Sequence, residues 1–268
     1  MKKIGLVSAK LKFARAAKHL KSIQRCIAKY SASRPYTIAK TKSKKTVKVV
    51  VLRQPPPQIA ILAGEMLYQI RSALDHLAFD LVKSNWGNAP LPIRWDKRCE
   101  FPLFVEVPTK GEPPVPYDTP LPKSVLAKNL PGISQQAFAF IEAVQPHYGT
   151  GAINNALRYL AQLSNIDKHR YLNVVVARVL KKDTVRFASG LRTTGFEAFN
   201  HGTELPAFTT GWTESDRAVY VNRRFHMRVC FGESEVLGEA TALAVDRLLQ
   251  LILEQIQTVI IPAFEELL

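Results

Sequence analysis

The chain has 268 residues, 47% of them hydrophobic, which is enough for one large domain or two small ones with a sizeable core. It contains no run of 18 or more apolar residues, so we expect no membrane span, and its basic start is too broken by lysines for a secretory signal. Its net charge of +15 favours polyanionic partners, and its three widely spaced cysteines indicate a reducing compartment, the cytoplasm, and argue against a disulfide framework or a structural zinc site.

The positive charge is concentrated at the beginning of the chain. Residues 1–53 hold sixteen Lys or Arg and no Asp or Glu. Helical spacing of apolar residues predicts a helix over 8–30, and β-branched residues predict a β-hairpin over 36–52 with its polar tip at 41–45. The basic side of the helix suits a nucleic acid, although a solvated outer face has the same pattern.

The strongest helical pattern lies at residues 58–83, between the triple proline at 55–57 and the stretch 84–87. We expect this helix to be central and buried on two sides, because its second side is aromatic and selectively polar rather than rich in Lys and Glu. The first apolar stripe comprises Ala63, Leu67, Ile70, Leu74, Leu77 and Leu81, and the second contains Tyr68, Ser72, Asp75 and Phe79.

The middle of the chain begins with a proline-rich, irregular stretch over residues 85–131, which is long for a loop. We expect the apolar run 101–105 to anchor this stretch and residues 123–128 to form a short helix. Two further helices are predicted, at 134–144 with Ser134 as N-cap and at 152–170.

Residues 171–231 change to short strand-like runs, which with the early hairpin are compatible with one antiparallel sheet. A last helix is predicted from about 235 to 260, capped by Ser234. The pattern predicts an α+β fold: a helical bundle with an inserted antiparallel β-sheet and an N-terminal β-hairpin. We expect a single domain over 1–268, with a basic helix and hairpin at 1–54, the bundle at 55–170 and 233–268, and the inserted sheet at 171–232.

Two short segments combine a carboxylate, a histidine and an arginine on helices. The first holds Arg71, Asp75 and His76; the second runs Asp167-Lys168-His169-Arg170. One interpretation is structural: Arg71 and Asp75 form an i,i+4 ion pair, His76 is a core histidine, and the second segment closes a helix end. The other interpretation is that the two segments pack together, because each contains groups that need partners when buried.

Arg71-x4-His76 on a helix of a bundle resembles the R-x4–6-H signature of HEPN ribonucleases. The resemblance implies a homodimer that cleaves RNA without a metal or other cofactor, leaving a 2′,3′-cyclic phosphate. His76 would then act in acid/base chemistry and Arg71 would stabilise the phosphorane. The segments RSALDHLA and NIDKHR also resemble a group of bacterial hypothetical proteins.

Three hypotheses follow. The first is an RNA-directed protein of HEPN type, a metal-independent endoribonuclease acting on RNA in preference to DNA. In it Arg71 and His76 are catalytic, and the supporting or substrate-contacting residues are Asp75, Asp167, Lys168, His169 and Arg170. The second is a non-catalytic nucleic-acid-binding or assembly module in which both clusters form a buried structural network. The third is a metal-dependent hydrolase with Asp75, His76, Asp167 and His169 as ligands.

Overall fold

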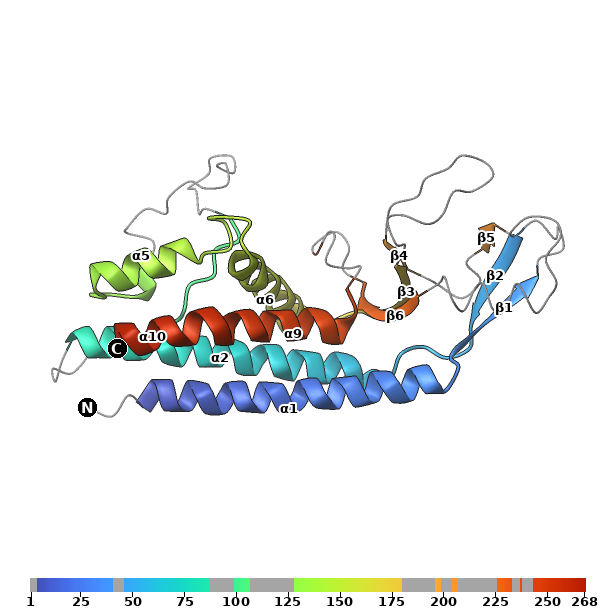
Figure 1. Cartoon of the computed structure of the whole chain (residues 1–268), viewed down its shortest axis with the longest axis horizontal. Helices are drawn as coiled ribbons and strands as arrows, with labels where there is room; N and C mark the ends of the chain where they lie inside the picture. Colours follow the sequence, from blue (N-terminus) through green and yellow to red (C-terminus); the bar gives the residue numbers. More distant parts are fainter. Residues whose placement is uncertain are drawn as a thin grey trace. The chain divides into compact units, whose positions relative to one another are not determined.

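The computed structural model describes residues 4–40, 46–86, 99–106, 128–179, 196–198, 204–206, 226–232, 237 and 243–268, and it has an α+β fold (Figure 1). Helices dominate, and the strands are short and antiparallel. The predicted class, a helical bundle with an antiparallel sheet and an N-terminal hairpin, is confirmed.

The predicted helices are present with shifted ends. Helix α1 spans Ile4–Ala32, α2 spans Gln58–Trp86, α5 spans Gln135–Ala143 and α6 spans Ala152–His169. Ser134 is the N-cap of α5, and its side-chain oxygen accepts a hydrogen bond from the backbone N–H of Ala137, as the sequence predicts.

The strands form two sheets in the described chain rather than the single sheet considered above. The hairpin of β1 (Tyr36–Lys40) and β2 (Thr46–Val51) is confirmed, and β5 (Glu204–Pro206) adds to the free edge of β2. The other sheet has β3 (Val174–Val179) between β4 (Phe196–Ala198) and β6 (His226–Phe231). The inserted segment therefore contributes strands to both sheets, which is a pairing that strand propensity does not encode.

The chain divides into two compact units. Unit 1 contains Met1–Lys21, Leu62–Tyr171 and Leu249–Leu268, and unit 2 contains Ser22–Ile61 and Leu172–Leu248. The strands of both sheets belong to unit 2, and every candidate residue of the two polar clusters lies in unit 1. The single domain over 1–268, with its predicted segments, stays a prediction.

Within unit 1, α1 and α2 run antiparallel. Ser8 hydrogen-bonds His76 and, further along, His19 lies beside Glu65. In both pairs the two residue numbers add to the same value, as they must when two helices of equal rise pass each other in opposite directions. Figure 1 shows these two helices side by side.

Helix α2 is the core helix of unit 1. All six residues of its predicted apolar stripe are buried. Around it pack α1, α6 and the carboxyl-terminal helix, where the buried ring of Phe264 contacts Phe101 and Phe140. The second contact face is confirmed only in part: Asp75 is half-buried, whereas Tyr68 is 66% exposed.

The last helix differs from its prediction at both ends. It starts with α9 (Val245–Gln255), passes through one π-helical turn, η2 (Ile256–Ile260), and ends with α10 (Ile261–Leu267). The predicted start at 235 is wrong, because Ala244 forms an isolated β-bridge with Cys230. Pro262 lies just after this π-helical turn, and because proline cannot donate to the helical hydrogen-bond ladder, the irregular turn lies where a regular ladder would be interrupted.

The stretch Val245–Leu267 is also long and apolar enough to cross a membrane by length and composition, with a mean hydropathy of 1.2 in its best window. That is weak support for a span, since a core helix has the same composition. Ile252, Ile256, Ile260 and Phe264 are buried at helical spacing, while Glu254 and Glu265 are exposed. This pattern is that of an amphipathic helix packed on a protein core.

Several predictions lie outside the described residues. These are the hairpin tip at 41–45, most of the irregular stretch 85–131 with nearly all of its short helix, the cap Ser234, and the strand-like runs at 184–191 and 218–222. The predicted anchor at 101–105 lies within the described residues, and its first two residues, Phe101 and Pro102, are buried.

Candidate functional site

Asp75 connects α2 to the segment 99–106. Its Oδ1 accepts a hydrogen bond of 2.9 Å from the backbone N–H of Phe101. Burial raises the pKa of the Asp75 carboxyl, and the positive charge of Arg71 one turn earlier and the bond from Phe101 oppose that rise. Asp75 therefore holds the irregular segment on the core, a structural task that explains its position.

His76 faces α1 instead. Its Nδ1 lies 2.8 Å from the Ser8 hydroxyl oxygen. Burial and the nearby Lys12 lower the pKa of His76, while Asp75 and Asp80 act in the opposite direction. The imidazole is consequently neutral at neutral pH and forms part of the α1–α2 contact.

Asp80 lies one turn beyond His76 on the same side of α2. Its Oδ2 accepts a hydrogen bond of 2.9 Å from the backbone N–H of Leu6, in the first turn of α1. A carboxylate at this end satisfies a free N–H and interacts favourably with the helix dipole. Gly5 permits the close approach, because a Cβ there would lie 2.4 Å from both the His76 carbonyl oxygen and the Asp80 carboxyl carbon.

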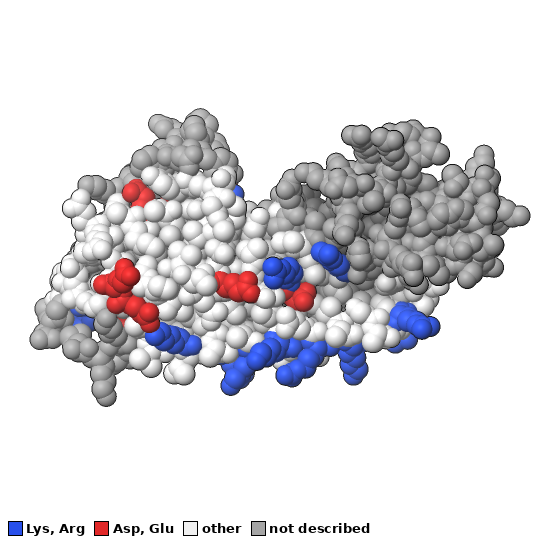
Figure 2. Space-filling view, viewed as in Figure 1, with Lys and Arg blue, Asp and Glu red and all other residues white. Residues whose placement is uncertain are grey.

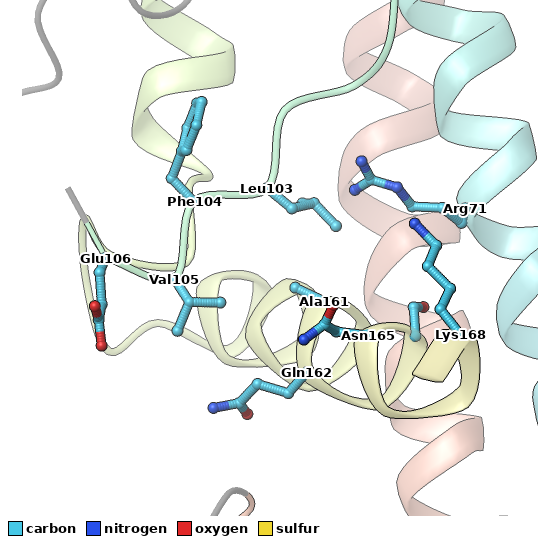
Figure 3. A pocket seen from close by; sticks show the side chains of 10 residues that line it. Arg71, Leu103, Phe104, Val105, Glu106, Ala161, Gln162, Asn165 and Lys168 are labelled. Carbon is cyan, nitrogen blue, oxygen red and sulfur yellow. The ribbon is translucent and has the colours of Figure 1, made fainter. Parts of the chain in front are cut away.

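Arg71 and His76 do not share a pocket. Five residues of α-helix separate two side chains by about 140° around the axis. His76 accordingly meets α1, whereas Arg71 lines a pocket between α2, α6 and the segment 99–106 (Figure 3). Lys168 of α6 lines the same pocket, so the structure brings together Arg71 and Lys168 from the two clusters.

The second cluster is exposed: Asp167, Lys168, His169 and Arg170 are all accessible to solvent. The expectation that both clusters need partners because they are buried is therefore wrong for this one. Asp167 does approach α2, since a Cβ on Gly64 would lie 2.5 Å from its Oδ1, and partial burial raises the pKa of the Asp167 carboxyl. Arg170 is the C-cap of α6 and its N–H donates to the Ile166 carbonyl.

The weakest of the three hypotheses, a metal site, finds no support in the geometry. Among the residues that the structure describes, no group of three or more His, Cys, Asp or Glu is arranged to hold a metal ion. This finding covers the suggested ligands, because all four are described residues: Asp75, His76, Asp167 and His169.

A basic face lies along α1. It consists of six exposed residues that fall within about 140° around the helix axis. Figure 2 shows Lys and Arg side chains in a row along the edge where α1 lies. We define the basic face as Lys10, Arg15, Lys18, Lys21, Arg25 and Lys29. Lys10 is partly neutralised, because its Nζ lies 2.5 Å from Glu265 Oε1.

A second pocket, of about 400 Å³, adjoins this face in unit 1. Arg15 belongs both to the basic face and to the pocket wall. The pocket also contains the exposed ring of Tyr68, the amide of Gln69 and the carboxylates of Glu65 and Asp167. His19, nearly buried, lies 3.3 Å through Nδ1 from Glu65 Oε2. An aromatic plane, hydrogen-bonding groups and a cation thus surround one open space.

The sequence interpretation missed the residues that make these contacts. The sequence pattern does not identify Asp80 and Ser8 as contact residues, although His76 and Asp80 have the i,i+4 spacing of neighbours on one helix face. Gly64 inside an apolar helix was a further signal, because mid-helix glycine is unfavourable unless another group approaches the backbone closely.

Comparison of the chain with protein-family models, with curated proteins and with solved structures finds no match.

Proposed function

We propose that the protein binds single-stranded nucleic acid, RNA in the first place, through the basic face of α1 and the Tyr68 pocket beside it. The observation that carries the proposal is the exposed Tyr68 ring next to Arg15, at the edge of a helix whose exposed side is cationic. As part of the same proposal, we place the protein in the cytoplasm with no membrane partner and no cofactor.

The cations supply the general affinity. Lys and Arg side chains that neutralise phosphates release condensed counterions, and this contribution does not depend on sequence. Exposed side chains at successive turns of α1 match the extended, repeating charge of a polynucleotide better than they match a small anion. The net charge of +15 adds long-range attraction toward the same partner.

The Tyr68 pocket supplies the preference for single strands. A base that is unstacked and unpaired stacks on an exposed aromatic ring, with about 1–3 kcal/mol per base, whereas duplex bases are not accessible. Gln69, Glu65 and Asp167 offer hydrogen-bonding groups to the edge of such a base. The preference for RNA over DNA comes only from the HEPN resemblance.

Fluorescence anisotropy with labelled oligonucleotides tests this function. We expect tight binding of single-stranded RNA and much weaker binding of duplex DNA of equal length. Tyr68→Ala is expected to weaken binding about tenfold or more and Tyr68→Phe much less, because phenylalanine keeps the ring. Tyr171→Ala is the matched control, since Tyr171 is 88% exposed and does not line the pocket.

Two results would count against this function. Equal affinity for single strands and duplexes would show that Tyr68 does not select single strands. An equal loss of RNA affinity in Tyr68→Ala and Tyr171→Ala would show that Tyr68 has no specific part in binding. Equal affinity for RNA and single-stranded DNA would leave the binding function but remove the RNA preference.

A second candidate is the metal-independent endoribonuclease, active as a homodimer. It is favoured by one observation: the lowered pKa of His76 keeps its imidazole neutral and able to accept a proton. Because Arg71 and His76 face different neighbours within one chain, the HEPN arrangement needs the second protomer to complete a site. The dimer is then essential to the activity rather than incidental.

RNA incubated with the protein in EDTA decides between these functions. Cleavage that His76→Ala abolishes, with products ending in 2′,3′-cyclic phosphate, supports the nuclease. Intact RNA under conditions where anisotropy shows saturation leaves the non-catalytic binding module. Wild-type protein and variant are purified in parallel, so that a contaminating ribonuclease cuts equally in both.

A further inference from the structure

The pocket that contains Arg71 is separate from the nucleic-acid surface proposed above. It measures about 440 Å³ and shares no lining residue with the Tyr68 pocket. Its walls come from α2, from the segment 99–106 and from one side of α6, where Ala161, Asn165 and Lys168 recur at helical spacing. Pockets of this size accept small molecules.

Two cations point into this space. Figure 3 shows the Arg71 and Lys168 side chains extending from their helices toward the same region. The acidic residue among the lining side chains is Glu106, which is exposed. Asp75 offsets part of the Arg71 charge from one turn away, and its hydrogen bond from the neutral Phe101 N–H leaves that negative charge in place. Of the described lining side chains, two are cationic and one is anionic, so the lining itself carries a net charge of +1 that Asp75 reduces.

The residues of α6 that line the pocket include buried polar groups without a partner in the described chain. The Ser164 hydroxyl oxygen and the Gln162 side-chain oxygen are buried, and neither has a hydrogen-bond partner within the described part of the chain. The two residues project about 160° apart around α6, and Figure 3 shows Gln162 directed away from Arg71 and Lys168, so the Ser164 hydroxyl is the one relevant to a ligand beside the two cations. Buried polar atoms are normally paired, and this hydroxyl is able to donate a hydrogen bond to a bound ligand or an ordered water.

We propose that this pocket binds a small phosphate ester. The guanidinium of Arg71 donates to two phosphate oxygens, the ammonium of Lys168 neutralises the second negative charge, and the Ser164 hydroxyl donates to the remaining oxygen. The organic part lies against Leu103, Val105 and Ala161, which supply the apolar wall. A carboxylate has one oxygen fewer and would leave one of these donors unused.

One feature of the pocket opposes an anion. Lys168 lies in the last turn of α6, and the carboxyl end of a helix carries partial negative charge. That effect reduces affinity about two- to fivefold at most, whereas each charge-assisted hydrogen bond raises it about tenfold or more. Two cations therefore outweigh one helix end.

Thermal melting of the full-length protein at constant ionic strength tests the site, with inorganic phosphate, phenyl phosphate and succinate as probes. Phenyl phosphate is expected to raise the melting temperature most, inorganic phosphate less, and succinate least. Lys168→Gln and Arg71→Gln are expected to weaken phenyl phosphate binding about tenfold or more. Lys128→Gln, which removes an exposed lysine outside the pocket, is the matched control and is expected to bind normally.

Ser164→Ala distinguishes a binding residue from a structural one. Without ligand this variant is expected to melt at the same or a higher temperature, because it removes a buried hydroxyl that has no partner. Its phenyl phosphate affinity is expected to fall about fivefold or more. A lower melting temperature of the unliganded variant would overturn the argument from the unpaired hydroxyl.

Three other results would overturn the proposal. These are no response of the wild-type protein to phenyl phosphate, a response to succinate equal to or greater than that to phenyl phosphate, and equal loss of binding in Lys168→Gln and Lys128→Gln. The proposal is independent of nucleic-acid binding: substitutions on the basic face of α1 are expected to leave phenyl phosphate binding unchanged. Loss of RNA binding with phosphate binding retained therefore removes one proposal and not the other.

Discussion

At the scale of single residues, the polar side chains of α2 serve three different neighbours. Asp75 accepts from the Phe101 backbone, His76 meets Ser8, and Arg71 enters a pocket with Lys168. Arg71 and Asp75, four positions apart, lie on one face of the helix toward the segment 99–106, whereas His76 projects about 100° away from Asp75 and meets α1. The spacing that resembles a catalytic pair is, within one chain, a pair of separate contacts.

His76 gives stability a predicted dependence on pH. Its pKa in the folded protein lies below 6.5, so the unfolded chain takes up a proton first as the pH falls. This histidine therefore destabilises the folded protein increasingly as pH drops from above 6.5 toward the folded pKa. We expect urea denaturation at pH 7.5 and pH 5.5 to show a larger loss for wild type than for His76→Asn, whose amide retains a polar partner for Ser8.

Two comparisons isolate the effect of His76. The raised pKa of Asp75 acts in the opposite direction, because the folded protein then holds a proton more readily, but Asp75 is present in both proteins and cancels in the difference. His169→Asn, at an exposed histidine, serves as control and is expected to follow wild type. Identical losses in wild type and His76→Asn would contradict the assignment.

At the scale of elements, one glycine in α1 and one in α2 each lie where another group closely approaches the helix backbone. The Cβ of an alanine at position 5 would meet the backbone carbonyl of His76, which cannot move without shifting α2. An alanine at position 64 would meet only the side chain of Asp167, which is exposed and able to rotate away. The two glycines look equivalent in the sequence and are not equivalent in the structure.

Alanine substitutions at these two positions are therefore predicted to differ. Gly5→Ala is expected to destabilise the protein by about 1–3 kcal/mol, the usual range for overpacking. Gly64→Ala is expected to be nearly neutral, because the gain in helix propensity, about 1 kcal/mol, offsets the displacement of Asp167. In an Asp167→Ala background the same substitution is expected to stabilise. Chemical denaturation measures all of these, and equal destabilisation by both single substitutions would refute the distinction.

The sequence predicts the helices well because periodic burial of apolar residues is a local pattern. The stripe of α2, from Ala63 to Leu81, is buried as expected, and the Ser134 cap is present. The sequence does not predict which partner each polar residue finds, since Asp80 reaches the start of α1 and Asp75 reaches Phe101 across long chain separations. The join of β5 to the hairpin and the start of α9 at Val245 depend on tertiary pairing in the same way.

At the scale of the whole molecule, charge separates into regions with different tasks. All the charged residues among the first 53 are Lys or Arg, and the exposed ones in α1 lie on one side of the helix. Cations that only improved solubility would be spread over the surface with acids interspersed. Such segregation predicts a polyelectrolyte partner whose affinity depends steeply on salt.

The salt dependence of RNA binding measures how many α1 cations take part. Each phosphate contact contributes about −0.7 to the slope of log K against log salt for single strands. Removing two cations with Lys21→Gln and Arg25→Gln is therefore expected to make the slope shallower by about 1.4. The control, Lys128→Gln with Arg247→Gln, removes the same net charge from exposed positions outside α1 and is expected to lower affinity slightly with the slope unchanged. If both double variants change the slope equally, RNA responds to the overall charge of the molecule and not to the basic face of α1.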